Sequence, residues 1–78
     1  MHERIEINPQ VRHGQPVIKG TRVPVTRILA EVADGTDFSE IQRQYDVTAA
    51  DIRAAVAFAN ELVADQAYIP VSPTPTKP

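Results

Sequence analysis

The chain has 78 residues, which is room for one domain, and a domain of this size is marginally stable by itself. It contains no cysteine, which excludes disulfides and thiolate metal sites, and its two histidines, His2 and His13, have no paired carboxylate spacing. The net charge of −2 hides an asymmetry: residues 1–30 carry five basic and two acidic side chains, whereas residues 31–78 carry three basic and eight acidic ones. This division indicates either two different partners or head-to-tail contact between subunits, unless the charges are simply solvated. A second subunit is the remaining means of stabilising so small a core, so we expect a homodimer.

Two short strands are predicted first. Residues 4–7 alternate between polar and apolar side chains before Asn8 and Pro9, which is typical of a half-buried strand and a turn. Residues 11–19 are interrupted by Gly14 and Pro16, and the apolar pair at 17–18 predicts the second strand. Because a lone hairpin is marginal in water, we expect these strands to pack on helices, to pair across a dimer, or both.

Two amphipathic helices are predicted next. The first has Thr26 as its N-cap and ends at Gly35, which suits a left-handed backbone conformation. The second opens at Asp37, which forms a capping-box pattern with Glu40. Its apolar side chains share one face: Phe38, Ile41 and Tyr45.

The third predicted helix is the longest, at roughly residues 49–67. Thr48 and Asp51 form a second capping-box pattern, and Val47 is expected to pack on Ile52. One apolar stripe contains Ile52, Val56, Ala59 and Val63 with Ala55 and Leu62 beside it, and another contains Ala54, Ala57 and Phe58. A helix that is apolar on more than one side is usually buried on more than one side, and the extra face predicts contact with a second copy.

The domain is expected to span residues 1–68, and a proline-rich tail residues 69–78. The tail has too little apolar surface to offset its ordering entropy, so we expect it to be extended or disordered. An inert tail and a segment that orders on binding a partner both remain open.

Two capped helices joined by a short turn, with a third helix ahead, form the layout of a helix-turn-helix domain. The same layout occurs in proteins that do not bind DNA, and Asp51 at the start of the third helix would repel phosphate. If DNA is bound, contacts are expected from Arg12, Lys19, Arg22, Arg27, Thr48 and Arg53. A structural alternative pairs Arg22 with Glu6 or Asp46.

No nucleophile–base set has a recognisable spacing, so we do not expect an enzyme, a small-molecule substrate, a cofactor or a metal site. No apolar run approaches the ~20 residues of a membrane span, and no secretory signal pattern opens the chain. We therefore expect a cytoplasmic protein.

Residues 13–25 read His-Gly-Gln-Pro-Val-Ile-Lys-Gly-Thr-Arg-Val-Pro-Val. This stretch resembles the opening signature of the bacterial family known as domain of unknown function 433. The pattern that follows in the family is also present over about residues 4–65: Gly35, Glu40-Ile41, Tyr45, Thr48 and the 51–59 segment. The chain departs from the family at His13, where a small or polar residue is common, and at Asp46-Val47, which replaces a proline-containing turn.

The resemblance implies a mainly α, α+β fold: a three-helix, winged-helix-like or homeodomain-like helix-turn-helix domain with short N-terminal strands. It also implies an antitoxin of a type II toxin–antitoxin module, which would neutralise a PIN-type nuclease toxin and repress its own operon through operator DNA. The alternatives are a DNA-binding regulator without a toxin and a dimerisation module. From the residues, we expect the dimer or partner interface at Ile5, Ile7, Ala54, Ala57, Phe58 and Tyr68.

Overall fold

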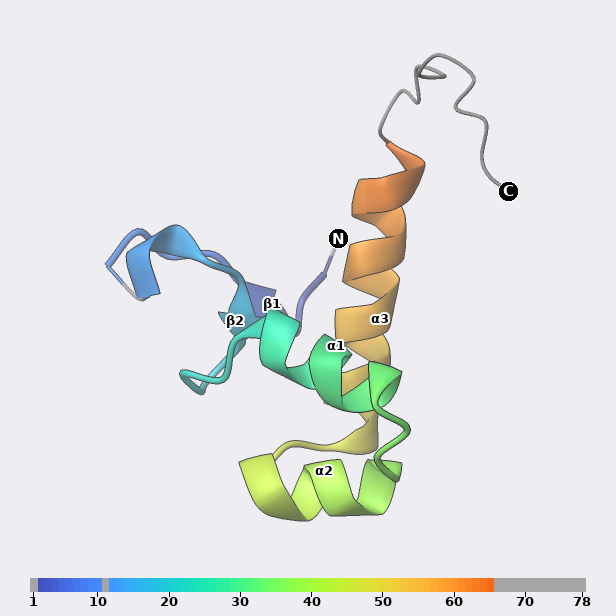
Figure 1. Ribbon diagram of the computed structural model, residues 1–78. Helices are drawn as coiled ribbons and strands as arrows, with labels where there is room; N and C mark the ends of the chain where they lie inside the picture. The colour runs from blue at the N-terminus through green and yellow to red at the C-terminus, as the bar shows by residue number, and fades with distance from the viewer. Residues whose placement is uncertain (1, 11, 66–78) are drawn as a thin grey trace, which may run out of the picture.

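The computed structural model describes residues 2–10 and 12–65. Within these residues, two short strands precede three helices (Figure 1). The elements are β1 (Ile5–Glu6), a 3-10 turn (Arg12–Gly14), β2 (Val17–Ile18), α1 (Val25–Ala33), α2 (Phe38–Tyr45) and α3 (Ala49–Ala64). The predicted mainly helical fold with a short N-terminal β element is thereby confirmed, and the predicted tail at 69–78 lies outside the described residues.

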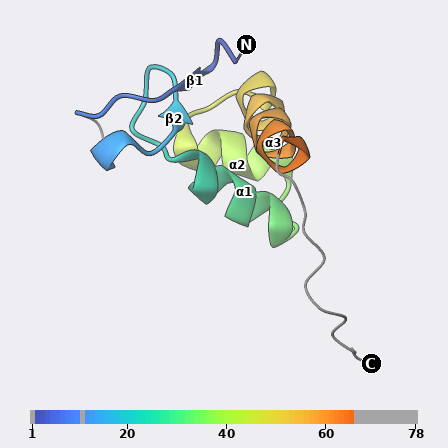
Figure 2. The same cartoon turned by 90° about the horizontal axis from the view of Figure 1, so that it is seen from above.

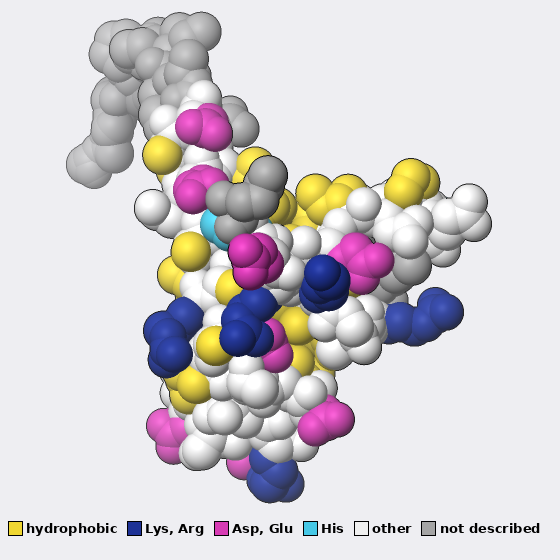
Figure 3. Space-filling view, turned by 180° about the vertical axis from the view of Figure 1, so that it is seen from behind, with side chains coloured by type: hydrophobic (Ala, Val, Ile, Leu, Met, Phe, Trp, Pro, Cys, Tyr) yellow, Lys and Arg dark blue, Asp and Glu magenta, His cyan; other side chains and the backbone are white. Residues whose placement is uncertain are grey.

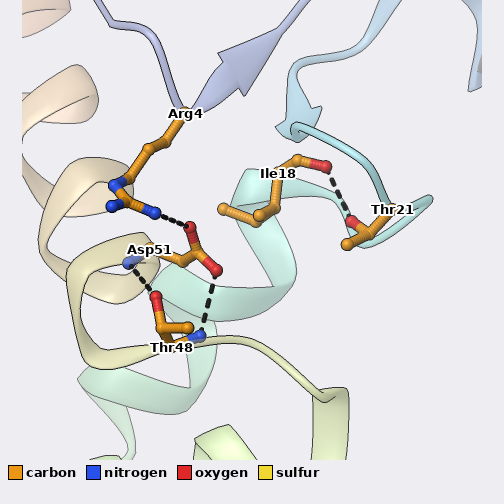
Figure 4. A network of polar contacts seen from close by, with 5 residues as sticks. All are labelled: Arg4, Ile18, Thr21, Thr48 and Asp51. Atoms are coloured by element: carbon orange, nitrogen blue, oxygen red, sulfur yellow. Dashed lines mark hydrogen bonds and ion pairs between the residues drawn. The ribbon is translucent and has the colours of Figure 1, made fainter.

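The two strands form an antiparallel pair in which Ile5 lies opposite Ile18. The other edge of β2 is also occupied, because the Ile18 amide donates to the Val23 carbonyl and Val17 forms a bridge with Pro24. In the turn between residues 18 and 23, the Thr21 hydroxyl donates to the Ile18 carbonyl at 2.7 Å (Figure 4). The same hydroxyl accepts from the Val23 amide at 2.9 Å. Strand β2 is therefore bordered by β1 on one edge and by residues 23–24, which lead into α1, on the other.

The first two helices begin differently from the sequence-based prediction. Helix α1 starts at Val25 with Pro24 as its N-cap, so Thr26 lies inside the first turn and the prediction of Thr26 as the cap is wrong. Proline is already fixed near the required φ, here −68°, and needs no side-chain cap. Asp37 is the N-cap of α2, but it makes no side-chain cap hydrogen bond. The predicted capping box is absent there, since the Glu40 carboxylate binds Arg43 instead.

Helix α3 begins as predicted and ends earlier. Thr48 and Asp51 form a complete capping box, with the Asp51 amide donating to the Thr48 hydroxyl and the Thr48 amide donating to the Asp51 carboxylate. The preceding turn places Asp46 in the left-handed region at φ 56°, where aspartate is better tolerated than most residues. The helix ends at Ala64, with Asp65 as its C-cap, rather than at residue 67.

The core lies where α1, α2 and the first half of α3 meet the hairpin. Its buried side chains are Ile18, Val25, Ile28, Ile41, Val47, Ile52 and Ala55. The second half of α3 extends past the other helices (Figure 1). From above, α3 is seen nearly end-on beside α1 and α2 (Figure 2). Val56 and Val63, which share the Ile52 face in the sequence pattern, are accordingly 41% and 54% exposed.

Candidate functional site

The N-terminal residues lie against the start of α3. Arg4, just before β1, donates from Nη1 to the Asp51 carboxylate at 3.1 Å (Figure 4). The second carboxylate oxygen of Asp51 accepts from the Thr48 amide at 3.0 Å. One carboxylate therefore caps α3 and also anchors the N-terminal residues.

This arrangement keeps Asp51 ionised. Burial opposes ionisation, but hydrogen bonds from Thr48 and from Arg4 outweigh it, so the pKa of Asp51 is lowered below its usual 3.8. From its sequence position alone, this carboxylate is expected to repel phosphate. Its charge is instead matched by the Arg4 guanidinium within the same chain.

The N-terminal residues also contact α3 further along the helix. His2 Nε2 lies 2.8 Å from Glu61 Oε1, and the His2 ring packs edge-on against Phe58 with centroids 5.2 Å apart. Ala54 and Phe58, two of the expected interface residues, are half-buried in their own chain, and Phe58 packs against the core. Ile5 is half-buried against the core as well, whereas Ile7 and Ala57 are exposed and Tyr68 lies outside the described residues.

A second polar network joins α1 to α2. The Glu31 carboxylate accepts from the Tyr45 hydroxyl at 2.6 Å and from the Thr36 hydroxyl at 2.9 Å. The Tyr45 hydrogen bond, then the Thr36 hydrogen bond and the nearby charge of Arg27, hold the pKa of Glu31 below its usual 4.5. The same Glu31 hydrogen bond raises the pKa of Tyr45. Arg27, expected to contact phosphate, is thus close to a carboxylate of its own helix.

The other expected DNA-binding residues are dispersed. Lys19 is exposed and lines an open hollow with Glu3, Arg4 and Asp51. Arg22 is exposed and has no ion pair within residues 2–10 and 12–65, so the predicted pairing with Glu6 or Asp46 is wrong. Thr48 is occupied by the capping box, and the side chain of Arg12 is not described.

Arg53 does not complete a basic patch with Lys19. It follows Asp51 by two residues, which places it about 200° away around α3. Arg53 therefore points away from the hollow that Asp51 and Lys19 line, although it is exposed. The structure brings Lys19 and Arg4 together, but it does not gather all six predicted residues into one surface.

The projecting half of α3 together with its C-cap, residues 56–65, forms a distinct surface that we call the α3 free end. Its large apolar side chains are exposed: Val56 by 41%, Leu62 by 51% and Val63 by 54%. Glu61 and Asp65 are exposed on it, and it has no lysine or arginine. In Figure 3 this part of the molecule displays yellow and magenta side chains without dark blue ones. Its apolar side chains are evident in the sequence pattern, but their position beyond the core is not.

Metal-binding groups and membrane-spanning helices are not found in the part of the chain that the structure describes. Residues 2–10 and 12–65 contain no group of three or more side chains of the types that hold a metal ion. Every buried side-chain nitrogen or oxygen in this part has a hydrogen-bond partner. No described helix is both long enough and apolar enough to span a membrane.

Comparison with known proteins identifies a family and a similar solved structure. A family model described as "Protein of unknown function (DUF433)" matches residues 5–59. The chain belongs to the DUF433 family. A crystal structure of a DUF433 member protein from Anabaena variabilis ATCC 29413 is similar, with 32% sequence identity and a TM-score of 0.71. The match covers 78% of this chain and 61% of that one, so this chain spans less than two thirds of the length of its structural relative. No curated protein matches.

The DUF433 match covers the hairpin, helices α1 and α2, and α3 up to residue 59. It also includes Asp51, which binds Arg4. Most of the α3 free end, from Asn60 onward, lies beyond the matched residues. The family assignment therefore accounts for the fold, whereas the exposed apolar and acidic surface at 60–65 is a property of this chain that the match does not cover.

Proposed function

We propose that this DUF433 protein acts by contact rather than by catalysis, as an antitoxin that binds a PIN-type nuclease toxin. The observation that carries the proposal is the α3 free end, where exposed Leu62 and Val63 belong to the same last turns as exposed Glu61 and Asp65. Helices with an exposed apolar face commonly dock into grooves of partner proteins. A nuclease binds its substrate at a basic surface, and acidic side chains placed there exclude nucleic acid electrostatically.

The test is inhibition of the nuclease encoded beside this protein's gene. The purified nuclease is assayed on RNA with increasing amounts of the wild-type protein and of a Leu62→Ala, Val63→Ala variant. We expect inhibition near one equivalent of wild type and a loss of at least about tenfold in potency for the variant, which corresponds to about 1.4 kcal/mol. Phe38→Ala serves as the control, because Phe38 is a 39% exposed apolar side chain on α2. A neighbouring gene product that is neither a nuclease nor bound by this protein would refute the proposal.

The second candidate function is repression of transcription by binding operator DNA. It is favoured by the stretch from Ile7 to Ala30, which contains four basic residues and no acidic one. Lys19 and Arg22 in this stretch are exposed, and neither forms an ion pair with another described residue. Such cations neutralise phosphates and release counterions, so affinity falls steeply with salt.

Binding to the promoter region of its own gene is measured at several salt concentrations. Lys19→Ala and Arg22→Ala should each weaken binding and make the salt dependence shallower by about one counterion. Arg27→Ala should have a smaller effect, because Arg27 lies close to Glu31 and Tyr45. Equal binding by the wild type and a Lys19→Ala, Arg22→Ala double variant would place the DNA contact elsewhere or exclude it.

A further inference from the structure

We infer that the α3 free end is the docking site for the basic hairpin region of a second copy of this chain. Four of the five large apolar side chains that the described residues expose lie in two places: Val56, Leu62 and Val63 on the α3 free end, and Ile7 beside β1. Ile7 is 60% exposed. Each place is too small to form an interface with the same place on a second copy. The two different places, one from each copy, can instead contact each other through their apolar side chains.

The charges of the two places are complementary. From Ala54 to Asp65 the chain carries Glu61 and Asp65 and no basic residue. From Ile7 to Pro24 it carries three basic residues and no acidic one, and two of these, Lys19 and Arg22, are described as exposed. Neither forms an ion pair within the described part of the chain, so both are free to meet an external carboxylate.

The shape of the molecule allows this contact to form twice. The α3 free end projects past the core in one direction, and the hairpin and its loops project in another (Figure 1). Within one chain the two protrusions belong to one packed unit, because β1 and α3 are in contact. A twofold axis between two copies instead places each helix end on the other copy's hairpin, which gives a closed, isologous dimer.

This arrangement differs from pairing between two α3 helices. The α3 flank that carries Ala54 and Phe58 is occupied by the chain's own His2, which contacts Phe58 and Glu61. A helix pair on that flank would have to displace these contacts. Val63 follows Phe58 by five residues and lies about 140° away around α3, so the hairpin of a second copy can reach Val63 while the His2 contacts stay in place.

Sedimentation of the purified protein between about 1 and 200 µM tests the inference. We expect a mass of twice 8.6 kDa for the wild type at high concentration. Leu62→Glu with Val63→Glu should raise the dimer dissociation constant by more than about tenfold, as should Ile7→Glu. Phe38→Glu changes an exposed apolar side chain on α2 and should leave the dimer intact. Circular dichroism confirms that each variant is folded.

A charge exchange distinguishes this dimer from others. One variant carries Asp65→Lys, which leaves the contact between His2 and Glu61 in place, and a second carries Lys19→Glu and Arg22→Glu. Each should be monomeric alone, because like charges then meet twice, and an equimolar mixture should form a heterodimer in which both contacts are again attractive. A monomeric wild type, or a dimer that survives in the second variant alone, would overturn the inference.

The inference is separable from the proposed function. The toxin is proposed to use the same α3 free end, so a second copy and a toxin would compete for it. Sedimentation uses this chain alone and no nuclease. A protein that inhibits the nuclease yet stays monomeric would refute only the dimer, and a dimer that does not bind the nuclease would refute only the antitoxin proposal.

Discussion

At the scale of single residues, two carboxylates each join parts of the chain that are distant in sequence. Asp51 links the start of α3 to Arg4, and Glu31 links α1 to Tyr45 at the end of α2. The capping role of Asp51 is readable from the sequence, because its partner Thr48 lies three residues away. The Arg4 and Tyr45 contacts are not readable, because they depend on how the elements pack.

Asp51→Ala should destabilise the protein by about 1 to 2 kcal/mol, because it removes the N3 half of the capping box and leaves the Arg4 guanidinium without its partner. Chemical denaturation at neutral pH measures the change. Arg53→Ala, on the exposed side of the same helix, is the control and should stay within about 0.5 kcal/mol of wild type. Equal effects of the two substitutions would contradict the assigned role of Asp51.

Tyr45→Phe should weaken the dependence of stability on acid pH. The folded-state pKa of Glu31 is lowered by the Tyr45 hydrogen bond, so the stability it contributes is complete above its usual value of 4.5 and is lost as pH falls through the lowered value. Because the pKa of Tyr45 is raised, its contribution is complete below pH 10 and is lost as pH rises through the raised value. Melting temperatures from pH 2 to 11 should therefore fall less steeply for Tyr45→Phe at both ends. A variant whose profile parallels the wild type would exclude this coupling.

At the scale of elements, the sequence predicts what local patterns determine and misses what packing determines. All five predicted strands and helices form, the Thr48 capping box is present, and Gly35 has the expected positive φ. The prediction of Thr26 as a cap is wrong because Pro24 suffices to start α1, and the Asp37 box is wrong because Glu40 has a closer cation in Arg43. The exposure of Val56 and Val63 is not predicted from the sequence, because both lie on the same helix face as the buried Ile52. How far the other helices extend along that face cannot be read from the sequence of α3.

Gly35→Ala tests how α1 ends. Gly35 has φ +83°, and a Cβ there would meet no atom within 4 Å, so the expected cost comes from the backbone alone. We expect a loss of about 1 to 2 kcal/mol in the free energy of unfolding. Gly35→Asn should cost less, because asparagine tolerates the left-handed region better. Denaturant titration compares the three proteins, and equal stability of Ala and Gly would show that the end of α1 can rearrange.

At the scale of the whole molecule, few side chains carry the stability. The core cluster has seven buried side chains, while Leu62, Val63 and Ile7 are more than half exposed. A partner that binds only the folded state stabilises it by mass action. A partner bound at the exposed α3 free end should therefore raise the free energy of unfolding of this protein.

The melting temperature should rise with protein concentration if two copies associate through the α3 free end. The increase should be reduced by high salt, because exposed Glu61 and Asp65 would face exposed cations. Differential scanning calorimetry between about 10 and 500 µM measures it. The Leu62→Glu, Val63→Glu variant should melt at one temperature across the range, and a concentration dependence retained in that variant would point to a different contact.

The position of His2 has a practical consequence for anyone who purifies this protein. Its ring lies on Phe58 and its Nε2 beside Glu61, so any peptide fused ahead of it begins directly above the exposed half of α3. A purification tag at that end would lie next to the surface that binding assays are meant to probe. Cleaving such a tag before measurement, and comparing both forms, is the simplest safeguard against a false negative.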